Sequence, residues 1–594
     1  MAEGNLKIHS ENILPIIKKW LYSDKEIFVR ELVSNSCDAL HKLKLLEVDD
    51  NYRIDIQIDK ENKKLTFSDN GIGMDKEEVE NYIAQIAFSG AEEFLDKYKE
   101  GKEGEQIIGH FGLGFYSAYM VASRVEIQTL SYKENAQPVY WNCDGSSTYT
   151  IDEGSKAERG TEVILSLSDG EEEFLDPARL RQILVSYCSF LPYPIYLNDS
   201  RINEKEPLWA KSATECTDKE YLDFYHHLFP MEPDPLFWVH LNVDFPFHLK
   251  GILYFPKLAR DADLKKETIK LFCNRVFVSD NCKDLLPDYL TILRGTLDSP
   301  DIPLNVSRSY LQMDRTVRQL GAHISKKISD RLSTLYRTDR EKFLACWPDI
   351  EMIIKFGALQ DEKFYERIKE FLVWKNSADE WTTAQEYLER KDEKTIFYTP
   401  DDKSAFLDLF NKKKIEVLQI PSTMIDNALI NFLEGKIGAK FKRIDADLGD
   451  TVLDPSKEKG LLDSEGKSES GKIADFFRKK LDLEEVEAKS LASDSLPACL
   501  VIKEEERRMR EALAFRGTAM PLVKPTFVVN TNSKLINAIY AVDKKDPELA
   551  KEMASTVYDL TRLSQKEMEP DGLSDFVSQT STLMEKLVCK LSET

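Results

Sequence analysis

The sequence predicts an α+β protein made of several domains. The chain has 594 residues, enough for roughly three or four domains of ordinary size. Apolar residues recur at intervals of three and four over residues 28–46, as on one side of a helix. Residues 54–67 alternate apolar and polar side chains instead, which is typical of a β-hairpin with one buried face. Further strands follow, so we expect a sheet covered by helices.

The composition is that of a soluble globular protein. Hydrophobic residues make up 42% and charged residues 31%, and the formal net charge is −23. A charge this negative argues against a nucleic-acid partner. The nine cysteines are scattered without a C-x-x-C pair or metal-ligand spacing, which favours reduced, buried thiols. We find no apolar stretch of about 18 residues and no signal pattern, so we expect a cytoplasmic protein without a membrane partner.

The first predicted helix carries three polar residues on one face. Glu31, Asn35 and Asp38 are spaced i, i+4 and i+7, so the latter two lie within about 40° of Glu31. Ser23 and Glu26 form a capping-box pattern before them. A surface helix normally turns such a face to water. The motifs that follow favour a ligand on this face instead.

Two glycine-bearing loops and a later Gly-Thr pair complete the pattern. Glycine lets backbone N–H groups approach a phosphate closely, and a helix N-terminus adds a positive dipole end. The second loop precedes residues 115–121, an apolar run that predicts such a helix. One G-x-x-G-x-G is weak evidence, but the ordered set is a strong signal. The set is E-x-x-x-N-x-x-D from Glu31, D-x-G-x-G from Asp69, G-x-x-G-x-G from Gly109 and then Gly160-Thr161.

These motifs resemble those of the GHKL ATPase superfamily, which binds ATP in a Bergerat-type fold, and the chain has no G-x-x-x-x-G-K-[ST] phosphate loop. The stretches RELVSNSCDAL, DNGIGM and GHFGLGFYSAYMVA are similar to the ninety-kilodalton heat-shock chaperones, most of all to the bacterial members. The resemblance implies a homodimeric stress-response chaperone. Such a protein binds and hydrolyses ATP with Mg²⁺ and remodels unfolded or partly folded client proteins.

The resemblance also implies roles for individual residues. Glu31 would activate the attacking water, and its alternative is a solvated helical acid. Asn35 would hold Mg²⁺ through its amide oxygen, and Asp69 would accept a hydrogen bond from the adenine amino group. Asp38 and Thr161 would support the adenine contact. The adenine and ribose wall would comprise Gly71, Gly73 and Met74, and the phosphate contacts would come from Gly109, Gly112, Gly114 and Phe115.

Residues 81–105 match the family's ATP lid, although a plain surface loop is the alternative. The expected hinges are Gly90, Gly101 and Gly104. The chain departs from the family pattern at three positions near this segment, where a lysine or arginine, a threonine and a glutamine are usual. These positions are Phe88, Ala91 and His110.

A cation for the γ-phosphate is expected from outside the first domain. Residues 301–308 match the family's arginine-bearing catalytic loop, with Arg308 as an arginine finger and Gln312 one turn further on. A structural role in an ordinary loop is the alternative for Arg308. If the arginine acts on the phosphate, hydrolysis depends on the docking of two domains.

We expect three domains. They are an ATP-binding α/β sandwich (1–210), an α/β middle domain (211–470) and an α+β dimerisation domain (471–594), with a linker at 453–470. A long loop is expected over 285–308, followed by a helix with apolar spacing over 317–335. Other expected helices cover 504–515 and the C-terminal residues from 573. Strands are expected at 125–129, 140–141, 148–151, 161–167, within 237–255, and at 395–398, 415–420 and 521–530.

The C-terminal helix has a continuous apolar pattern that needs a partner surface. Packing within its own domain is one possibility, and the family uses this helix as the seam of a homodimer. The sequence ends in Leu591-Ser-Glu-Thr594, so we expect no MEEVD tail of the kind that recruits tetratricopeptide co-chaperones. The apolar pattern comprises Phe576, Val577, Thr580, Leu583, Leu587, Val588 and Leu591.

Two other classes of the same superfamily compete with the chaperone. A type II topoisomerase subunit or a MutL protein should carry a basic DNA-tracking surface, and the topoisomerase an acidic metal site. A histidine kinase needs a phosphoacceptor helix before the ATPase domain, yet the motifs here begin by residue 31. The acidic charge and the position of the motifs favour the chaperone.

Overall fold

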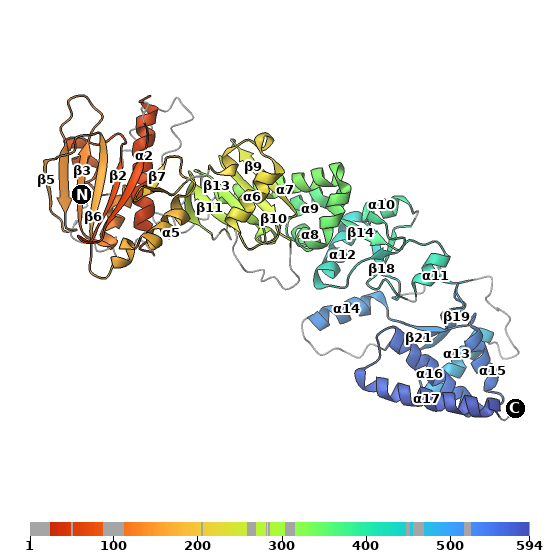
Figure 1. Ribbon diagram of the computed structural model, residues 1–594. Helices are drawn as coiled ribbons and strands as arrows, with labels where there is room; N and C mark the ends of the chain where they lie inside the picture. The colour runs from red at the N-terminus through yellow and green to blue at the C-terminus, as the bar shows by residue number, and fades with distance from the viewer. Residues whose placement is uncertain are drawn as a thin grey trace, which may run out of the picture. The chain divides into compact units, whose positions relative to one another are not determined.

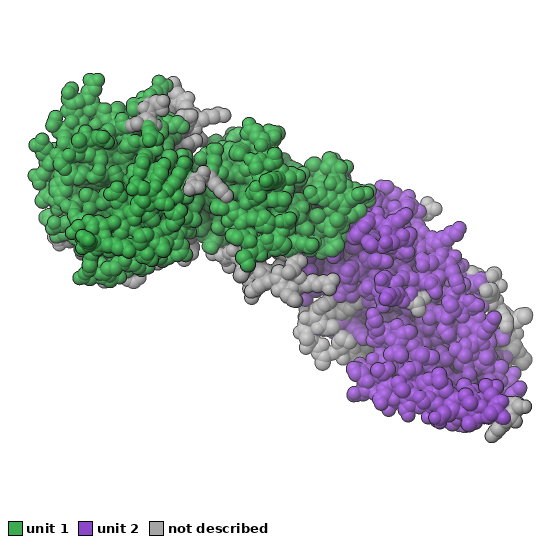
Figure 2. Space-filling model, viewed as in Figure 1, with its two compact units in different colours: residues 1–350 green, residues 351–594 purple. Residues whose placement is uncertain are grey.

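The computed structural model describes residues 24–48, 51–86, 108, 112–203, 206–257, 269–280, 282, 285–302, 315–391, 393–404, 406–446, 452–454, 468–515 and 524–592. The chain divides into two compact units at residue 350, drawn in green and purple in Figure 2. Figure 1 labels their helices and strands. Each unit combines two β-sheets with helices, which confirms the α+β class. The three-domain division stays a prediction.

The first sheet has eight strands in the order β5-β4-β3-β6-β2-β1-β7-β8. The predicted hairpin is β1 and β2, an antiparallel pair whose alternate residues are buried. The expected strands after it also form, each slightly longer than predicted. The strands are β1 (Ile54–Asp59), β2 (Lys64–Asp69), β3 (Ala122–Leu130), β4 (Val139–Cys143), β5 (Tyr149–Glu153), β6 (Gly160–Leu167), β7 (Ile195–Leu197) and β8 (Ser200–Arg201).

Helix α2 (Ile27–Leu45) packs on this sheet through its apolar residues. Phe28 meets the ring of Phe67 on β2 edge to face, with centroids 6.2 Å apart. The helix begins three residues later than the capping-box pattern predicts, and the Glu26 carboxylate pairs with Arg179. The other helices of this layer are α3 (Lys76–Tyr82), η3 (Gly114–Met120), η4 (Glu172–Leu175) and α5 (Pro177–Cys188).

The second sheet of this unit has the order β12-β11-β13-β10-β9. The loop predicted over 285–308 is wrong in part, because β13 lies within it and occupies the centre of the sheet. Its short sequence contains Gly295 with a φ of +136°, which obscures the strand pattern. The strands are β9 (Phe237–Val243), β10 (Leu249–Phe255), β11 (Ile269–Cys273), β12 (Val276–Ser279) and β13 (Arg294–Asp298).

Helices complete this second layer, and aromatic residues join it to the first. The ring of Phe190, which follows α5, lies 4.8 Å from that of Trp209 and 5.5 Å from that of Phe272 on β11. The helix predicted over 317–335 is confirmed, and the apolar residues of its stripe are buried. The helices are η5 (Leu208–Ala210), η6 (Ala213–Glu215), α6 (Asp218–Leu228), η7 (Asp288–Leu290) and α7 (Arg315–Thr338), and α8 (Arg340–Gln360) runs across residue 350.

The second unit begins with a five-stranded sheet in the order β15-β14-β17-β16-β18. The strand predicted over 415–420 is confirmed only as the two residues of β17, which pair with β14 and β16. The strands are β14 (Val373–Asn376), β15 (Trp381–Thr383), β16 (Thr395–Thr399), β17 (Leu418–Gln419) and β18 (Lys440–Arg443). The helices are α9 (Glu362–Ile368), η8 (Lys369–Phe371), α10 (Ala384–Glu389), α11 (Leu407–Lys412) and α12 (Met424–Ile437).

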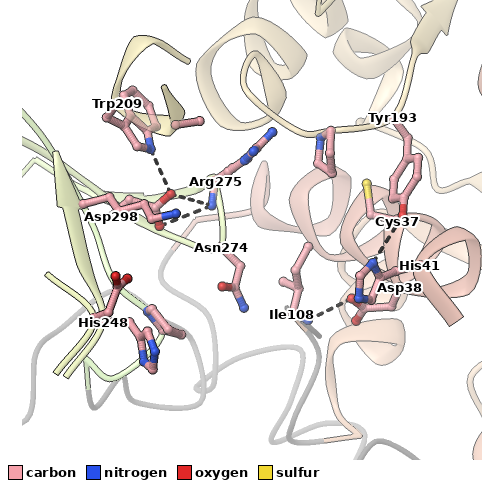
Figure 3. A pocket seen from close by; sticks show the side chains of 15 residues that line it. Cys37, Asp38, His41, Ile108, Tyr193, Trp209, His248, Asn274, Arg275 and Asp298 are labelled. Carbon is pink, nitrogen blue, oxygen red and sulfur yellow. Dashed lines mark hydrogen bonds between the residues drawn. The ribbon is translucent and has the colours of Figure 1, made fainter. Parts of the chain in front are cut away.

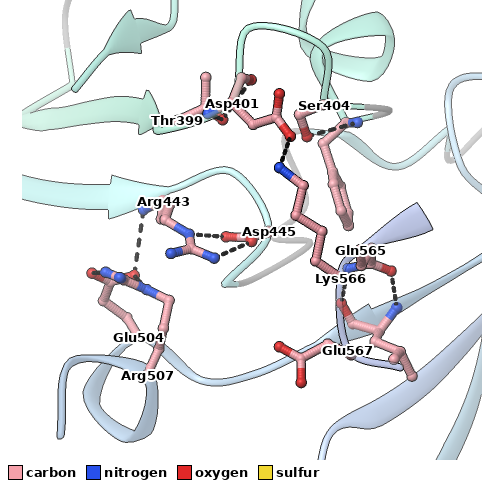
Figure 4. Close-up of polar contacts among 12 residues, drawn as sticks. Thr399, Asp401, Ser404, Arg443, Asp445, Glu504, Arg507, Gln565, Lys566 and Glu567 are labelled. Atoms are coloured by element: carbon pink, nitrogen blue, oxygen red, sulfur yellow. Dashed lines mark hydrogen bonds and ion pairs between the residues drawn. The ribbon is translucent and has the colours of Figure 1, made fainter. Parts of the chain in front are cut away.

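A three-stranded sheet and five helices form the rest of this unit, and the expected helices and strand near residues 504, 526 and 573 are present. Polar contacts tie the two sheets together (Figure 4). Lys566 Nζ lies 3.1 Å from Asp401 Oδ2. Arg507 Nη2 also donates to the Tyr398 hydroxyl at 2.6 Å. The elements are α13 (Glu469–Leu481), β19 (Val486–Lys489), β20 (Ala498–Val501), α14 (Glu504–Phe515), β21 (Thr526–Asn530), α15 (Lys534–Val542), α16 (Pro547–Ser564) and α17 (Pro570–Ser592).

Two chain-wide expectations can be compared with the structure. All nine cysteines are free, and seven of them are buried, as the scattered spacing predicts. Within the described residues, we find no helix whose length and apolar character would let it cross a membrane.

Candidate functional site

The predicted polar face of α2 is present, and it is buried at both ends. Glu31 and Asp38 are only 4% and 8% exposed, whereas Asn35, one turn after Glu31, is exposed. Buried acids rarely occur without a partner or a function. The helix therefore presents one accessible amide between two enclosed carboxylates.

Glu31 has a partner that sequence reasoning missed. The guanidinium of Arg30 donates from Nε and Nη2 to Glu31 Oε1, at 3.0 and 2.8 Å. Both side chains are almost fully buried. The signal in the sequence was a charged residue that interrupts the apolar run at the start of α2. Neighbouring positions on a helix do not usually face each other, so the pairing could not be read from spacing.

Asp69 ends strand β2 and points its carboxylate back toward α2. Its Oδ1 accepts a hydrogen bond from the Gly71 N–H at 2.9 Å. The Ser36 hydroxyl of α2 and the backbone of Thr161 also hydrogen-bond this carboxylate. Burial raises the pKa of Asp69 to about 6, although these bonds and the nearby Lys156 oppose the shift. The structure thus holds a solvent-shielded acceptor at this position.

The turn after Asp69 is packed so tightly that only glycine fits at positions 71 and 73. A Cβ on Gly71 would lie 2.7 Å from Ala39 Cβ of α2. Gly73 has a φ of +62°, and a Cβ there would lie 1.9 Å from the carbonyl oxygen of Leu130. The next residue, Met74, is partly buried against the core. The three predicted wall residues therefore lie together between α2 and β3.

A second group that the motifs did not single out is Thr129 on β3. Its hydroxyl oxygen accepts from the Met74 N–H at 3.0 Å and lies 3.0 Å from the Thr161 hydroxyl oxygen. Thr161 pairs with Asp69 across strands β6 and β2. The predicted residues Asp69, Met74 and Thr161 thus form one connected group.

The second glycine loop ends beside Glu31. Gly112 has a φ of +61°, and a Cβ on Gly114 would lie 2.5 Å from Glu31 Oε2. The helix predicted over 115–121 is instead the seven-residue 3-10 helix η3. Its aromatic residues are packed into the core, and Phe115 meets Trp141 at 5.8 Å. A short 3-10 turn has a smaller aligned dipole than an α-helix, so the backbone at the glycines matters more here.

Asp38 makes a contact that the sequence motifs do not predict. Its Oδ1 accepts from the backbone N–H of Ile108 at 2.8 Å, and both residues are buried (Figure 3). Asp38 also lines a cavity of about 380 Å³ together with residues of the second sheet. The bond connects α2 to the residue directly before Gly109.

Several predicted residues lie outside the described part of the chain. They are Gly109, Arg308, Gln312, the hinge glycines Gly90, Gly101 and Gly104, and the departures Phe88, Ala91 and His110. Among the described residues, no three His, Cys, Asp or Glu side chains come together as a metal site. The exposed amide of Asn35 fits an ion whose other ligands are phosphate and water, as is usual for Mg²⁺.

Comparisons with known proteins agree with this arrangement. A family model described as Hsp90 protein matches residues 198–593, and one described as histidine kinase-, DNA gyrase B- and HSP90-like ATPase matches residues 22–171. The chaperone protein HtpG of Bacteroides fragilis strain YCH46 is 40% identical over 588 residues, which cover 92% of this chain and 85% of that protein. HtpG of Porphyromonas gingivalis strain W83 is 39% identical over 591 residues, covering 92% and 85%. HtpG of Geobacter metallireducens is 30% identical over 654 residues, covering 99% of each chain.

Proposed function

The chain belongs to the Hsp90 family of ATP-dependent molecular chaperones, and we propose that it hydrolyses ATP on the polar face of α2. The family match excludes the topoisomerase, MutL and histidine-kinase alternatives. The observation that carries the proposal is the position of Glu31, Asn35 and Asp38 on one helix face, next to the glycine turns and Asp69.

We assign adenine recognition to Asp69. A buried carboxylate accepts a hydrogen bond from the adenine amino group, and Ser36 and the Gly71 N–H hold it in place. Thr161 and Thr129 support the same group from β6 and β3. Discrimination is expected to be strong, because a base with a carbonyl at this position would leave Asp69 facing a second acceptor.

We assign the hydrolytic step to Glu31. Its carboxylate lies beside Gly114, at the end of the loop that would contact the phosphates. A carboxylate there can orient a water molecule and accept its proton during attack on the γ-phosphate. Asn35 would hold Mg²⁺ through its amide oxygen, and the ion would neutralise charge on the phosphates. From the family resemblance, Arg308 and Gln312 would complete the site from the predicted middle domain.

We further propose that the protein is a homodimer joined through α17. The residues of the predicted apolar pattern lie on two faces: Leu583 is buried toward the unit, while Val577 and Val588 are 56% and 65% exposed. Met584, which is not part of the predicted pattern, is 61% exposed. The exposed residues lie within about 60° of one another on the helix, as does Leu591. Packing within the unit therefore accounts only for the buried inner face, and a second copy of the chain would cover the exposed outer face.

Client proteins are the expected partners of a chaperone in this family, and we place it in the cytoplasm. Nine free cysteines suit a reducing compartment.

The decisive experiment compares ATP turnover and nucleotide binding in the wild type and in Glu31→Ala. The variant should bind ATP with ordinary affinity and lose about 10²- to 10⁴-fold in turnover, the usual worth of a general base. Glu47→Ala, which changes an exposed acid just after α2, serves as the matched control. Unchanged turnover in Glu31→Ala would refute its assigned role.

A further inference from the structure

Arg159 lies one residue before β6 begins, and its side chain contacts the turn that follows Asp69. Its Nε donates to the Gly71 carbonyl at 3.1 Å and to the Asn70 carbonyl at 3.3 Å. Its Nη2 donates to the Asn70 carbonyl at 3.2 Å. One partly buried guanidinium therefore holds two successive carbonyl groups.

The peptide group between Asn70 and Gly71 is engaged at both of its ends. Its carbonyl oxygen accepts from Arg159, and its N–H donates to Asp69 Oδ1 at 2.9 Å. This group is planar and rigid, so holding one end also orients the other. A cation at the carbonyl oxygen also polarises the group and makes the N–H a stronger donor.

The two glycines at this turn have no room for a side chain. A Cβ on Gly160 would lie 2.0 Å from the Asp69 carbonyl oxygen, and a Cβ on Gly71 would contact Ala39. Contacts to backbone groups therefore hold the turn at these positions. Asn70 contributes from the other side, because its side chain bonds the backbone of Arg53 and Asn51, each at 2.9 Å.

We propose that Arg159 is a positioning residue for Asp69: it fixes the Asn70–Gly71 peptide group, whose N–H holds the Asp69 carboxylate toward the adenine amino group. The proposal rests on the adenine role proposed for Asp69. Arg159 then contributes to affinity for the adenine half of the nucleotide, and hydrolysis of bound ATP does not depend on it.

The test uses the full chain and measures affinity for ADP and for adenosine by calorimetry, together with kcat and KM for ATP. Arg159→Gln should weaken the binding of ADP and of adenosine by the same factor, about tenfold, which is a typical loss for one hydrogen-bonded group. KM should rise in proportion, while kcat stays within about twofold. The affinities of Arg159→Lys should lie between those of the wild type and Arg159→Gln, because an ammonium is a point charge without the planar fork of a guanidinium. Arg124→Gln, on an exposed arginine of β3, should change nothing.

Two results would overturn the proposal: unchanged adenosine affinity in Arg159→Gln, whether or not ADP affinity falls, or a fall in kcat that parallels the loss of affinity. Thermal unfolding shows whether Arg159→Gln is folded, and Arg159→Lys replaces it if it is not. Asp69→Asn distinguishes a failure of the adenine role of Asp69 from a failure of the positioning role of Arg159. If that variant binds ADP normally, the adenine role of Asp69 itself is wrong. If it loses binding while Arg159→Gln does not, only the positioning role fails.

Discussion

Arg30 Nη2 lies 2.8 Å from Glu31 Oε1, and the two side chains form an ion pair enclosed in the protein. The guanidinium binds the carboxylate through Oε1 and so fixes its orientation. Proton transfer from a water molecule would use the other oxygen, Oε2. That oxygen is the one beside Gly114.

The enclosed pair makes a specific prediction for stability. Arg30→Met leaves Glu31 buried without its cation, which typically costs about 3–5 kcal/mol. Arg30→Met combined with Glu31→Gln should recover much of that loss, because no uncompensated charge remains. Denaturant midpoints of the three variants measure the effect. A double variant as unstable as Arg30→Met would show that packing of the arginine stem, and not charge, dominates.

Asp69→Asn should stabilise the nucleotide-free protein at neutral and higher pH while it abolishes ADP binding. The pKa of Asp69 is about 6 in the fold, against an ordinary aspartate pKa of 3.8, so the fold binds this proton more tightly than the unfolded chain does. The stability from that proton is present below about 4 and is lost as the pH rises through about 6. Asparagine does not titrate, so the greater stability of Asp69→Asn over the wild type at pH 8 should vanish as the pH falls to 4.

Thermal midpoints between pH 4 and 8 check this prediction. Asp59→Asn is the control, because hydrogen bonds from Asn62 lower the pKa of the Asp59 carboxyl. Asp59→Asn should change stability in the opposite direction. The ionised Asp59 carboxylate contributes stability above its ordinary pKa, and this contribution is lost on acidification. A pH-independent difference for Asp69→Asn would contradict the assignment of the shift to burial.

Arg308→Ala should keep nucleotide affinity and lose turnover by about 10³- to 10⁵-fold, the usual range for an arginine finger. The expectation rests on the family resemblance of residues 301–308. ATPase assays with binding measured in parallel provide the check. If turnover falls in Glu31→Ala but not in Arg308→Ala, the predicted ATP-binding domain hydrolyses ATP without help from the predicted middle domain.

Val588→Lys on the outer face of α17 should yield monomers, because an ammonium buried in an apolar seam is costly. Ser578→Lys is the matched control, since position 578 is also exposed and lies on another side of the helix. Sedimentation velocity distinguishes the two states. A dimeric Val588→Lys variant would place the seam elsewhere.

Short-range patterns determined much of this protein from sequence alone. The spacing of Glu31, Asn35 and Asp38 predicts their common face, because helical periodicity depends on neighbours a few residues apart. The hairpin and the glycine turns around Gly71 and Gly73 are local in the same sense. The family resemblance then supplied the activity, and the family comparisons bear it out.

Tertiary structure decided what depends on residues distant in the chain. Gly295 obscures the pattern of strand β13, whose sheet partners come from distant segments. The two faces of α17 become distinct only when the helix packs against α16. The contacts of Arg159 with Asn70 and Gly71 join residues about ninety positions apart. Asp38 likewise binds Ile108, seventy residues away. A periodicity carries no information on such contacts, because they form only when packing brings separate elements within hydrogen-bonding distance.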